Sequence, residues 1–145
     1  MKTVLLLCTG SAARSQMAEG WVNARFGDRW HAASAGVAPK GLDPKAVPAM
    51  AETGIDSSGQ RSKHVDELVE GVFGLVVTLG DDAAAHCPAW PPGAARKIHL
   101  PFDDPGRVRA EGGDVEVLAV MRRVRDQMLW QLPEALRQFE RTVTR

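Results

Sequence analysis

Short apolar runs alternate with longer amphipathic segments along this chain. Four runs have the length and composition of strands, at 3–7, 31–34, 73–79 and 97–100. The third is apolar almost throughout, which is typical of a parallel strand that is covered on both faces. The pattern therefore predicts four strands, with 73–79 as the central one.

The segments between these runs carry apolar residues at helical spacing. They predict four helical segments, at 14–26, 43–53, 65–70 and 115–141. Asp43 and Pro44 suit an N-cap followed by proline at the first helical position, and Gly54 suits the end of that helix. Pro133 is expected to kink or divide the last helix.

The order of these elements predicts a doubly wound α/β fold. Strands that alternate with helices favour right-handed crossovers and a four-stranded parallel sheet flanked by helices on both faces. In such folds the ligand site lies beyond the carboxyl ends of the strands. A length of 145 residues, of which 44% are hydrophobic, suits one domain over 1–145.

Composition excludes several classes of partner. The 18 basic and 18 acidic residues balance, so the net charge predicts neither a nucleic-acid footprint nor a membrane surface. The apolar runs are too short for a membrane span or a signal peptide, so we expect a soluble, cytoplasmic protein. We also expect it to be a monomer. Cys8 and Cys87 are far apart in sequence, which argues against a metal site and against a disulfide scaffold.

A loop of small residues joins the first predicted strand to the first predicted helix. It begins at Cys8 and ends at Arg14, and between them stand Thr9, Gly10, Ser11, Ala12 and Ala13. Small residues let backbone amides close around an oxyanion, and the helix adds its positive end. Arg14 supplies a fork of donors, and the same field favours the thiolate of Cys8 as a nucleophile. The alternative for Cys8 is a packed core cysteine.

A second candidate element lies in the loop after the fourth predicted strand. Asp103 and Asp104 precede Pro105 there, and a carboxyl group near Cys8 would protonate the oxygen that leaves the oxyanion. The alternative is ordinary turn chemistry, because Asp, Pro and Gly are frequent in turns.

Several motifs together make the chain similar to a known superfamily. They are Cys8-Thr9-Gly10, Arg14-Ser15-Gln16-Met17-Ala18-Glu19-Gly20, Ser34-Ala35-Gly36, Pro44-Lys45-Ala46, Ser62-Lys63, Val76-Val77-Thr78-Leu79, Cys87-Pro88 and Asp103-Asp104-Pro105. With these motifs the chain resembles the low-molecular-weight tyrosine phosphatase superfamily and, within it, the phosphatase-like arsenate reductases. The resemblance runs essentially end to end and implies the same four-stranded α/β fold.

The resemblance also implies roles for individual residues. Cys8 would attack arsenate, Arg14 and the loop amides would hold its oxygens, and Asp104, directly before the proline, would protonate the departing oxygen. Ser15 matches the hydroxyl that hydrogen-bonds the sulfur of the nucleophile. The product of this step is an arsenic adduct on Cys8, which a second thiol must reduce.

The source of that second thiol is where the chain departs from its relatives. Thioredoxin-coupled members carry a cysteine at the position of Gly80 and another at the position of Cys87. Cys87 is a candidate resolving thiol or a packed remnant. Because the internal relay is incomplete, the simpler expectation is an external thiol, namely glutathione, mycothiol or bacillithiol with a glutaredoxin-like protein, with thioredoxin as the alternative redox partner.

Further departures surround the loop. Ser11 stands where an asparagine usually braces the loop, and Ala13 stands where some relatives carry another cysteine. Some relatives bind potassium through an acidic residue at the position of Lys63. The ammonium group of Lys63 would replace that cation, with Glu19 and Ser34 in the same network, and a solvated surface lysine is the alternative.

Two rival functions remain at this point. A phosphatase for phosphate monoesters would use the same Cys8, Arg14 and Asp104, but the chain contains no tyrosine to grip a substrate ring. A non-catalytic oxyanion-binding protein would need neither a nucleophile nor an acid. The primary expectation is therefore arsenate reduction, with arsenate and phosphate-like oxyanions as ligands and a transient redox protein as partner.

Overall fold

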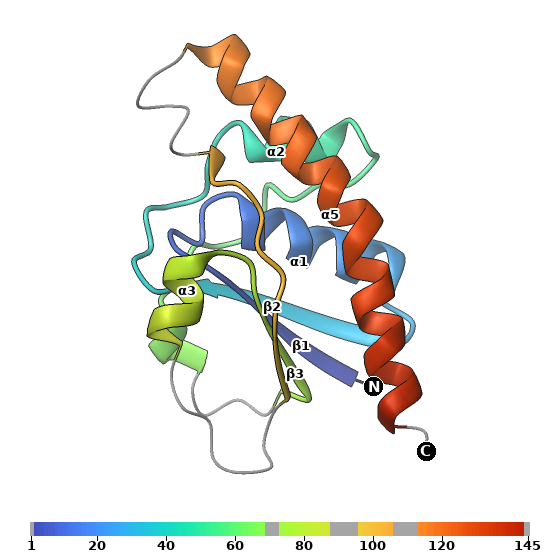
Figure 1. Ribbon diagram of the computed structural model, residues 1–145. Coiled ribbons are helices and arrows are strands. Elements are labelled where there is room, and N and C mark those ends of the chain that lie inside the picture. Colours follow the sequence, from blue (N-terminus) through green and yellow to red (C-terminus); the bar gives the residue numbers. More distant parts are fainter. Residues whose placement is uncertain (1, 69–72, 88–95, 106–112, 144–145) are drawn as a thin grey trace.

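The computed structural model describes residues 2–68, 73–87, 96–105 and 113–143. Its strands are β1 (Lys2–Cys8), β2 (Trp30–Gly36), β3 (Leu75–Thr78) and β4 (Arg96–His99). They form one parallel sheet in the order β2-β1-β3-β4 (Figure 1). This arrangement confirms the predicted four-stranded α/β fold, with β1 and β3 at the interior positions of the sheet.

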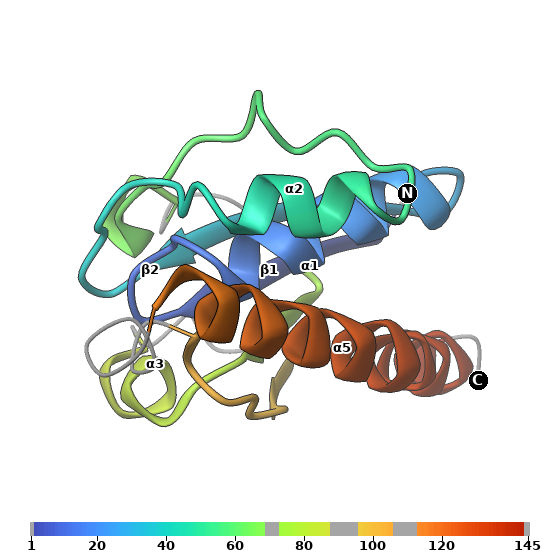
Figure 2. The same cartoon turned by 90° about the horizontal axis from the view of Figure 1, so that it is seen from above.

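Helices cover both faces of the sheet. The described helices are α1 (Arg14–Arg25), α2 (Ala46–Ala51), the 3-10 helix η1 (Val65–Leu68), α3 (Asp81–His86) and α5 (Asp114–Val143). On one face α1, α2 and α5 pack against one another, as the view from above shows (Figure 2). On the other face η1 contacts β2, and α3 contacts β1 and β3.

The alternation of side chains along β1 divides the core between these two faces. Val4, Leu6 and Cys8 belong to the larger apolar cluster beneath α1 and α5. Leu5 and Leu7 belong to the smaller cluster on the face of η1 and α3. All four aliphatic side chains of β1 are fully buried, as expected for an interior parallel strand.

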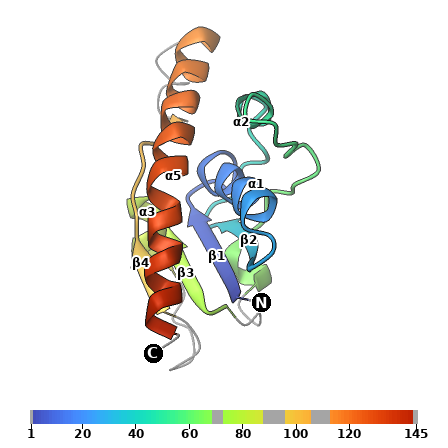
Figure 3. The same ribbon diagram turned by 90° about the vertical axis from the view of Figure 1, so that its right-hand side faces the viewer.

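The long helix α5 contacts the start of β2 through residues near its own C-terminus. Figure 3 shows α5 running along the sheet on the side of β3 and β4. The indole Nε1 of Trp30 donates a hydrogen bond to Glu140 at 2.7 Å, and its ring lies 5.5 Å from that of Phe139. Among the described helices none is long and apolar enough to cross a membrane.

Two sequence predictions about helices require correction. The helix α2 begins at Ala46 with Lys45 at its N-cap, so Asp43 stands two residues before the cap and its Oδ1 accepts the backbone N–H of Lys45 in the turn that precedes the helix. Pro133 does not divide the last helix, since α5 continues through it and buried residues Met128, Leu132 and Leu136 hold both sides in the core. The helix α3 was not predicted at all.

Candidate active site

The candidate site lies at the carboxyl end of β1, where the loop 9–13 leads into α1. Cys8 is the last residue of the strand, and Arg14 is the first residue of the helix. Ala13 occupies the N-cap and has no polar side chain to occupy the first N–H groups of the helix. Sequence analysis therefore predicted both the position of this loop and the elements on either side of it.

A neighbouring segment holds the loop closed through its backbone. The N–H groups of Ala38, Lys40 and Asp43 donate to carbonyl oxygens of the loop at 2.8, 2.9 and 2.9 Å. Gly36 lies so close that a Cβ there would be 2.6 Å from both the N of Ser11 and the carbonyl oxygen of Thr9. Any side chain at position 36 would therefore push the loop out of place.

Ser11 occupies the strained position of the loop. Its φ of 48° lies in the left-handed region that few residues other than glycine adopt. Nε2 of Gln16 compensates by donating to the carbonyl oxygen of Ser11 at 2.9 Å and to its Oγ at 3.0 Å. Nε2 of Gln60 in turn donates to Oε1 of Gln16 at 2.8 Å. The loop is thus braced from α1 and from the segment around residue 60, and sequence analysis did not find this brace.

Cys8 is 2% exposed and faces the loop. Its Sγ lies 3.0 Å from Oγ of the buried Ser15. In the thiol form the S–H group of Cys8 donates this hydrogen bond to Oγ of Ser15, and in the thiolate form the hydroxyl group would donate a hydrogen bond to the sulfur instead. The structure thus places Ser15 in contact with the sulfur, as the resemblance implied.

Arg14 is held by contacts with the ends of β3 and β4. Its Nη1 donates to the carbonyl oxygens of Leu79 at 3.3 Å and Phe102 at 3.1 Å. Its Nη2 lies 3.4 Å from Oγ1 of Thr9 and 3.6 Å from Oδ2 of Asp104. One end of the guanidinium is therefore anchored on backbone, and the other faces the loop and a carboxylate.

The two adjacent aspartates occupy different environments. Asp104 lines a cavity of about 280 Å³ together with Cys8 and Arg14. The carboxylate of Asp103 instead pairs with Arg123 on α5 at 3.0 Å, and both side chains are exposed. The structure thus places Asp104 in the lining of the cavity at Cys8, while Asp103 lines only the adjoining hollow.

The remaining lining of this cavity comes from small loop residues and from the segment 40–44. Gly10, Ala12 and Ala13 form the loop side, while Lys40 and Asp43 contribute charged groups from the opposite side. Sequence analysis did not identify Lys40 or Asp43 as site residues. Their only signal was their place in a loop after the second strand.

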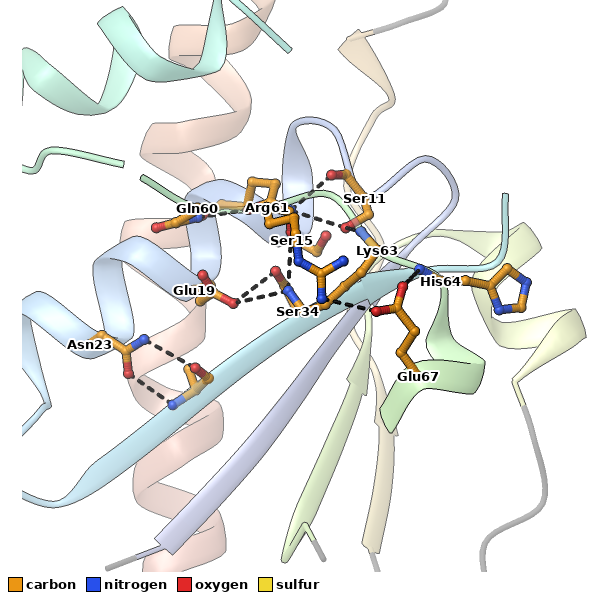
Figure 4. A network of polar contacts seen from close by, with 12 residues as sticks. Ser11, Ser15, Glu19, Asn23, Ser34, Gln60, Arg61, Lys63, His64 and Glu67 are labelled. Carbon is orange, nitrogen blue, oxygen red and sulfur yellow. Dashed lines mark hydrogen bonds and ion pairs between the residues drawn. The ribbon is translucent and has the colours of Figure 1, made fainter. Parts of the chain in front are cut away.

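The network predicted for Lys63, Glu19 and Ser34 is present in the structure. Oγ of Ser34 donates to Oε1 of Glu19 at 3.0 Å, and Nζ of Lys63 lies 3.9 Å from the same oxygen (Figure 4). Nζ of Lys63 also donates to the carbonyl oxygen of Arg61 at 3.1 Å. The side chain of Lys63 is 12% exposed, so the ammonium belongs to this network and not to the open surface.

Cys87 lies apart from the nucleophile. It follows the last residue of α3 and packs against the smaller apolar cluster, whereas Cys8 belongs to the larger cluster on the other face of the sheet. Cys87 does not line the cavity at Cys8. The structure therefore does not bring the candidate resolving thiol to the site, and Pro88 lies outside the described residues.

No group of three or more His, Cys, Asp or Glu side chains is placed to hold a metal ion among the residues that the structure describes. The cavity brings together a thiol, a guanidinium and a carboxylate group, from Cys8, Arg14 and Asp104. Fold and site together define an α/β domain of the phosphatase type, with its candidate site at the carboxyl end of β1. The family pattern of low molecular weight phosphotyrosine protein phosphatases matches residues 3–132, and the chain belongs to this family.

Comparisons with known proteins place the chain near one branch of the family. It is 45% identical over 141 residues to an arsenate reductase of Bacillus licheniformis, covering 97% of this chain and 96% of that protein. It is 48% identical over 127 residues to an arsenate reductase of Bacillus subtilis, covering 88% and 89%. A solved arsenate reductase in its phosphate-binding state is 26% identical, with a TM-score of 0.73 and coverage of 96% and 99%.

Proposed function

We propose that this protein reduces arsenate to arsenite through an adduct on Cys8. The observation that carries the proposal is the cavity that unites Cys8, Arg14 and Asp104 at the end of β1. The arsenate reductases of the two Bacillus species, at 45% and 48% identity, support arsenate as the substrate.

The first step is a displacement at arsenic. The thiolate of Cys8, hydrogen-bonded by Ser15, forms an S–As bond, while Arg14 and the amides of residues 9–13 hold the remaining oxygens. One As–OH bond of the arsenate breaks, and the hydroxyl group leaves as water because it takes one proton from Asp104. Arsenic stays pentavalent in this step, because a sulfur ligand replaces an oxygen ligand.

The second step is the reduction. An external thiolate attacks the sulfur of Cys8, the S–As electron pair goes to arsenic, and arsenite leaves while the two sulfurs form a mixed disulfide. A second thiol then reduces this disulfide and restores Cys8. A polar hollow of about 380 Å³ adjoins the cavity and shares Arg14, Lys40 and Asp104 with it, which offers the external thiol an approach.

The position of Cys87 favours an external thiol over an internal one. Cys87 packs on the opposite face of the sheet from Cys8, and Gly80 has no thiol to bridge them. Glutathione, mycothiol or bacillithiol with a glutaredoxin-like protein therefore fits the site better than a disulfide relay to thioredoxin.

Phosphate-ester hydrolysis is the second candidate function, because the family is described by its phosphatases and the same three residues would serve it. The cavity lining argues against an aryl phosphate as the main substrate. No aromatic residue lines the cavity among the described residues, and the whole chain lacks tyrosine.

The test measures arsenate-dependent NADPH oxidation with the glutaredoxin-linked and the thioredoxin-linked reducing systems. We expect turnover with a small thiol and glutaredoxin, no turnover for Cys8→Ser, and retained turnover for Cys87→Ser. Hydrolysis of p-nitrophenyl phosphate is measured in parallel. Rapid ester hydrolysis without arsenate turnover in any thiol system would favour the phosphatase, and the absence of both activities would favour a binding protein.

A further inference from the structure

The polar hollow beside the cavity at Cys8 is lined by charged side chains from several segments of the chain. They come from the start of α1, the segment after β2, the first turn of α3 and the loop after β4. The charged residues of the lining are Arg14, Lys40, Asp81, Asp82, Asp103 and Asp104. A molecule that enters this hollow therefore meets both cations and carboxylates beside the nucleophile.

Most of these charged groups already have a partner within the protein. Arg14 and Asp104 lie 3.6 Å apart, and the carboxylate of Asp103 pairs with an arginine of α5 at 3.0 Å. Asp81 lies 3.0 Å from the imidazole Nε2 of the last residue of β4. These groups are held by the fold, so a ligand in the hollow would have to compete for them.

Lys40 and Asp82 are different. Within residues 2–68, 73–87, 96–105 and 113–143, neither the ammonium of Lys40 nor the carboxylate of Asp82 makes an ion pair or a side-chain hydrogen bond. The stem of Lys40 lies along the oxyanion loop, because its Cγ and Cδ would be 3.4 Å from a Cβ at Gly10. Asp82 belongs to the first turn of α3. The hollow thus presents one cation and one anion, on different segments, that the fold leaves open.

An open cation and an open anion in one hollow favour a ligand that carries both charges. Its carboxylate would pair with Lys40 and its ammonium group with Asp82, so that electrostatic complementarity would select the ligand and set its orientation. Glutathione and bacillithiol carry an ammonium group and carboxylates beside their thiol, whereas mycothiol carries neither charge. Lys40 also lines the cavity that contains Cys8, so a thiol held in this way would lie next to the nucleophile.

We infer that the hollow is a binding site for a zwitterionic low-molecular-weight thiol, with Lys40 as the residue for a carboxylate and Asp82 as the residue for the ammonium group. This inference rests on the proposed function, in which an external thiol resolves the adduct on Cys8. It adds which thiols the protein selects, because the site favours glutathione and bacillithiol over mycothiol.

The test follows thiol–disulfide exchange at Cys8 and needs no arsenate. The thiolate of Cys8 attacks one sulfur of a symmetrical disulfide, the S–S bond breaks, and one thiolate leaves while a mixed disulfide forms on Cys8. Mass spectrometry of the whole protein, in a Cys87→Ser background, gives the rate. The probes are glutathione disulfide with both charges, cystamine with ammonium groups only, dithiodipropionate with carboxylates only, and bis(2-hydroxyethyl) disulfide with neither.

Each rate is divided by the rate with the neutral disulfide, which cancels any effect of a substitution on Cys8 itself. For Lys40→Met we expect this relative rate to fall about threefold with glutathione disulfide and with dithiodipropionate, as for the loss of one partly exposed ion pair. For Asp82→Asn we expect a similar fall with glutathione disulfide and with cystamine. The matched controls are Lys97→Met and Asp56→Asn, since neither residue lines the hollow or the cavity.

Bacillithiol disulfide is measured beside glutathione disulfide, and the higher relative rate in the parent identifies which of the two zwitterionic thiols the site prefers. Unchanged relative rates in both variants would overturn the inference, as would equal falls for all charged disulfides whichever residue is replaced. A parent in which Cys8 forms no mixed disulfide with either zwitterionic disulfide would also overturn it. A parent that shows the crossed dependence on charge but never reduces arsenate would contradict the proposed function and leave the thiol site standing.

Discussion

Two nearly buried arginines in this protein have different electrostatic surroundings. Arg14, 5% exposed, donates to the backbone carbonyls of Leu79 and Phe102 and has one carboxylate, Asp104, at 3.6 Å. Arg125, 9% exposed, lies 2.6 Å from Glu52 and 2.8 Å from Asp126 and also donates to the carbonyl oxygen of Ala49.

The comparison separates an arginine that serves a ligand from one that serves the fold. Two close carboxylates neutralise the charge of Arg125 and tie α5 to α2. Carbonyl oxygens fix the direction of the Arg14 guanidinium without neutralising its charge, and that group lines a cavity. An anchored but incompletely paired cation attracts an anion, because its field is not cancelled within the protein.

The largest expected effect concerns the carboxylate beside Arg14. Asp104→Asn removes the proposed acid, and we expect arsenate turnover to fall by about 10²–10⁴-fold. Asp56→Asn is the matched control, because that exposed carboxylate accepts hydrogen bonds from Ser58 and lines neither the cavity nor the adjoining hollow. Turnover is measured by coupled NADPH oxidation. Equal losses for the two asparagine variants would contradict the assignment of Asp104.

The next effect concerns Arg14 itself. Arg14→Lys keeps a positive charge but loses the planar fork, and we expect turnover to fall by about 10²–10³-fold. The same substitution at Arg125 is expected to leave turnover within about twofold, since Arg125 has no contact with the cavity. Comparable loss of turnover in both lysine variants would show that the two arginines do not differ in the way proposed.

Much of the arrangement around Arg14 could be predicted from sequence because it is local. An apolar run, a loop of five residues and a helical segment place Cys8, Ser15 and Arg14 together, because all three are close in sequence. The spacing alone could not choose between Asp103 and Asp104, since which carboxylate turns inward depends on Arg123 on α5. The resemblance to known relatives made that choice.

Long-range contacts account for most of what sequence could not predict. The close approach of Gly80 to Arg14 brings together the N-terminal ends of α3 and α1, and nothing in the local pattern at position 80 indicates it. Gln16 donates a hydrogen bond to Ser11, whose backbone has a positive φ. No sequence motif indicates either the positive φ or this hydrogen bond. The helix α3 has only six residues, too few for helical periodicity to be visible, although two aspartates mark its first turn.

The third prediction concerns stability and tests whether Arg125 stabilises the fold. Arg125→Met keeps the aliphatic stem but removes the hydrogen bonds to Ala49 and Glu52. We expect the free energy of unfolding to fall by about 2 kcal/mol, typical of lost hydrogen bonds to a charged group. Urea denaturation measures the loss. Unchanged stability, or a loss of turnover in the folded variant, would contradict the structural role.

The smallest effect is a dependence of stability on pH at the carboxylate beside Arg125. Hydrogen bonds from Arg122, which has the larger effect, and from Arg125 lower the pKa of Glu52 from 4.5 to about 2. Because the pKa is lower in the folded protein, the charged carboxylate stabilises the fold above its ordinary pKa. That contribution is lost as the pH falls from about 4.5 to about 2.

Glu52→Gln isolates this contribution from other acid effects. The carboxylates of Glu67 and Glu134 also have lowered pKa values, but they are common to parent and variant and cancel in the comparison. We expect the variant to melt a few degrees below the parent at pH 7, and the difference to shrink as the pH falls below 4.5. A Tm difference that stays constant from pH 7 to pH 3 would mean that Glu52 stabilises the fold through packing and not through its charge. The electrostatic surroundings of Arg125 and Arg14 would then be more alike than the contacts indicate.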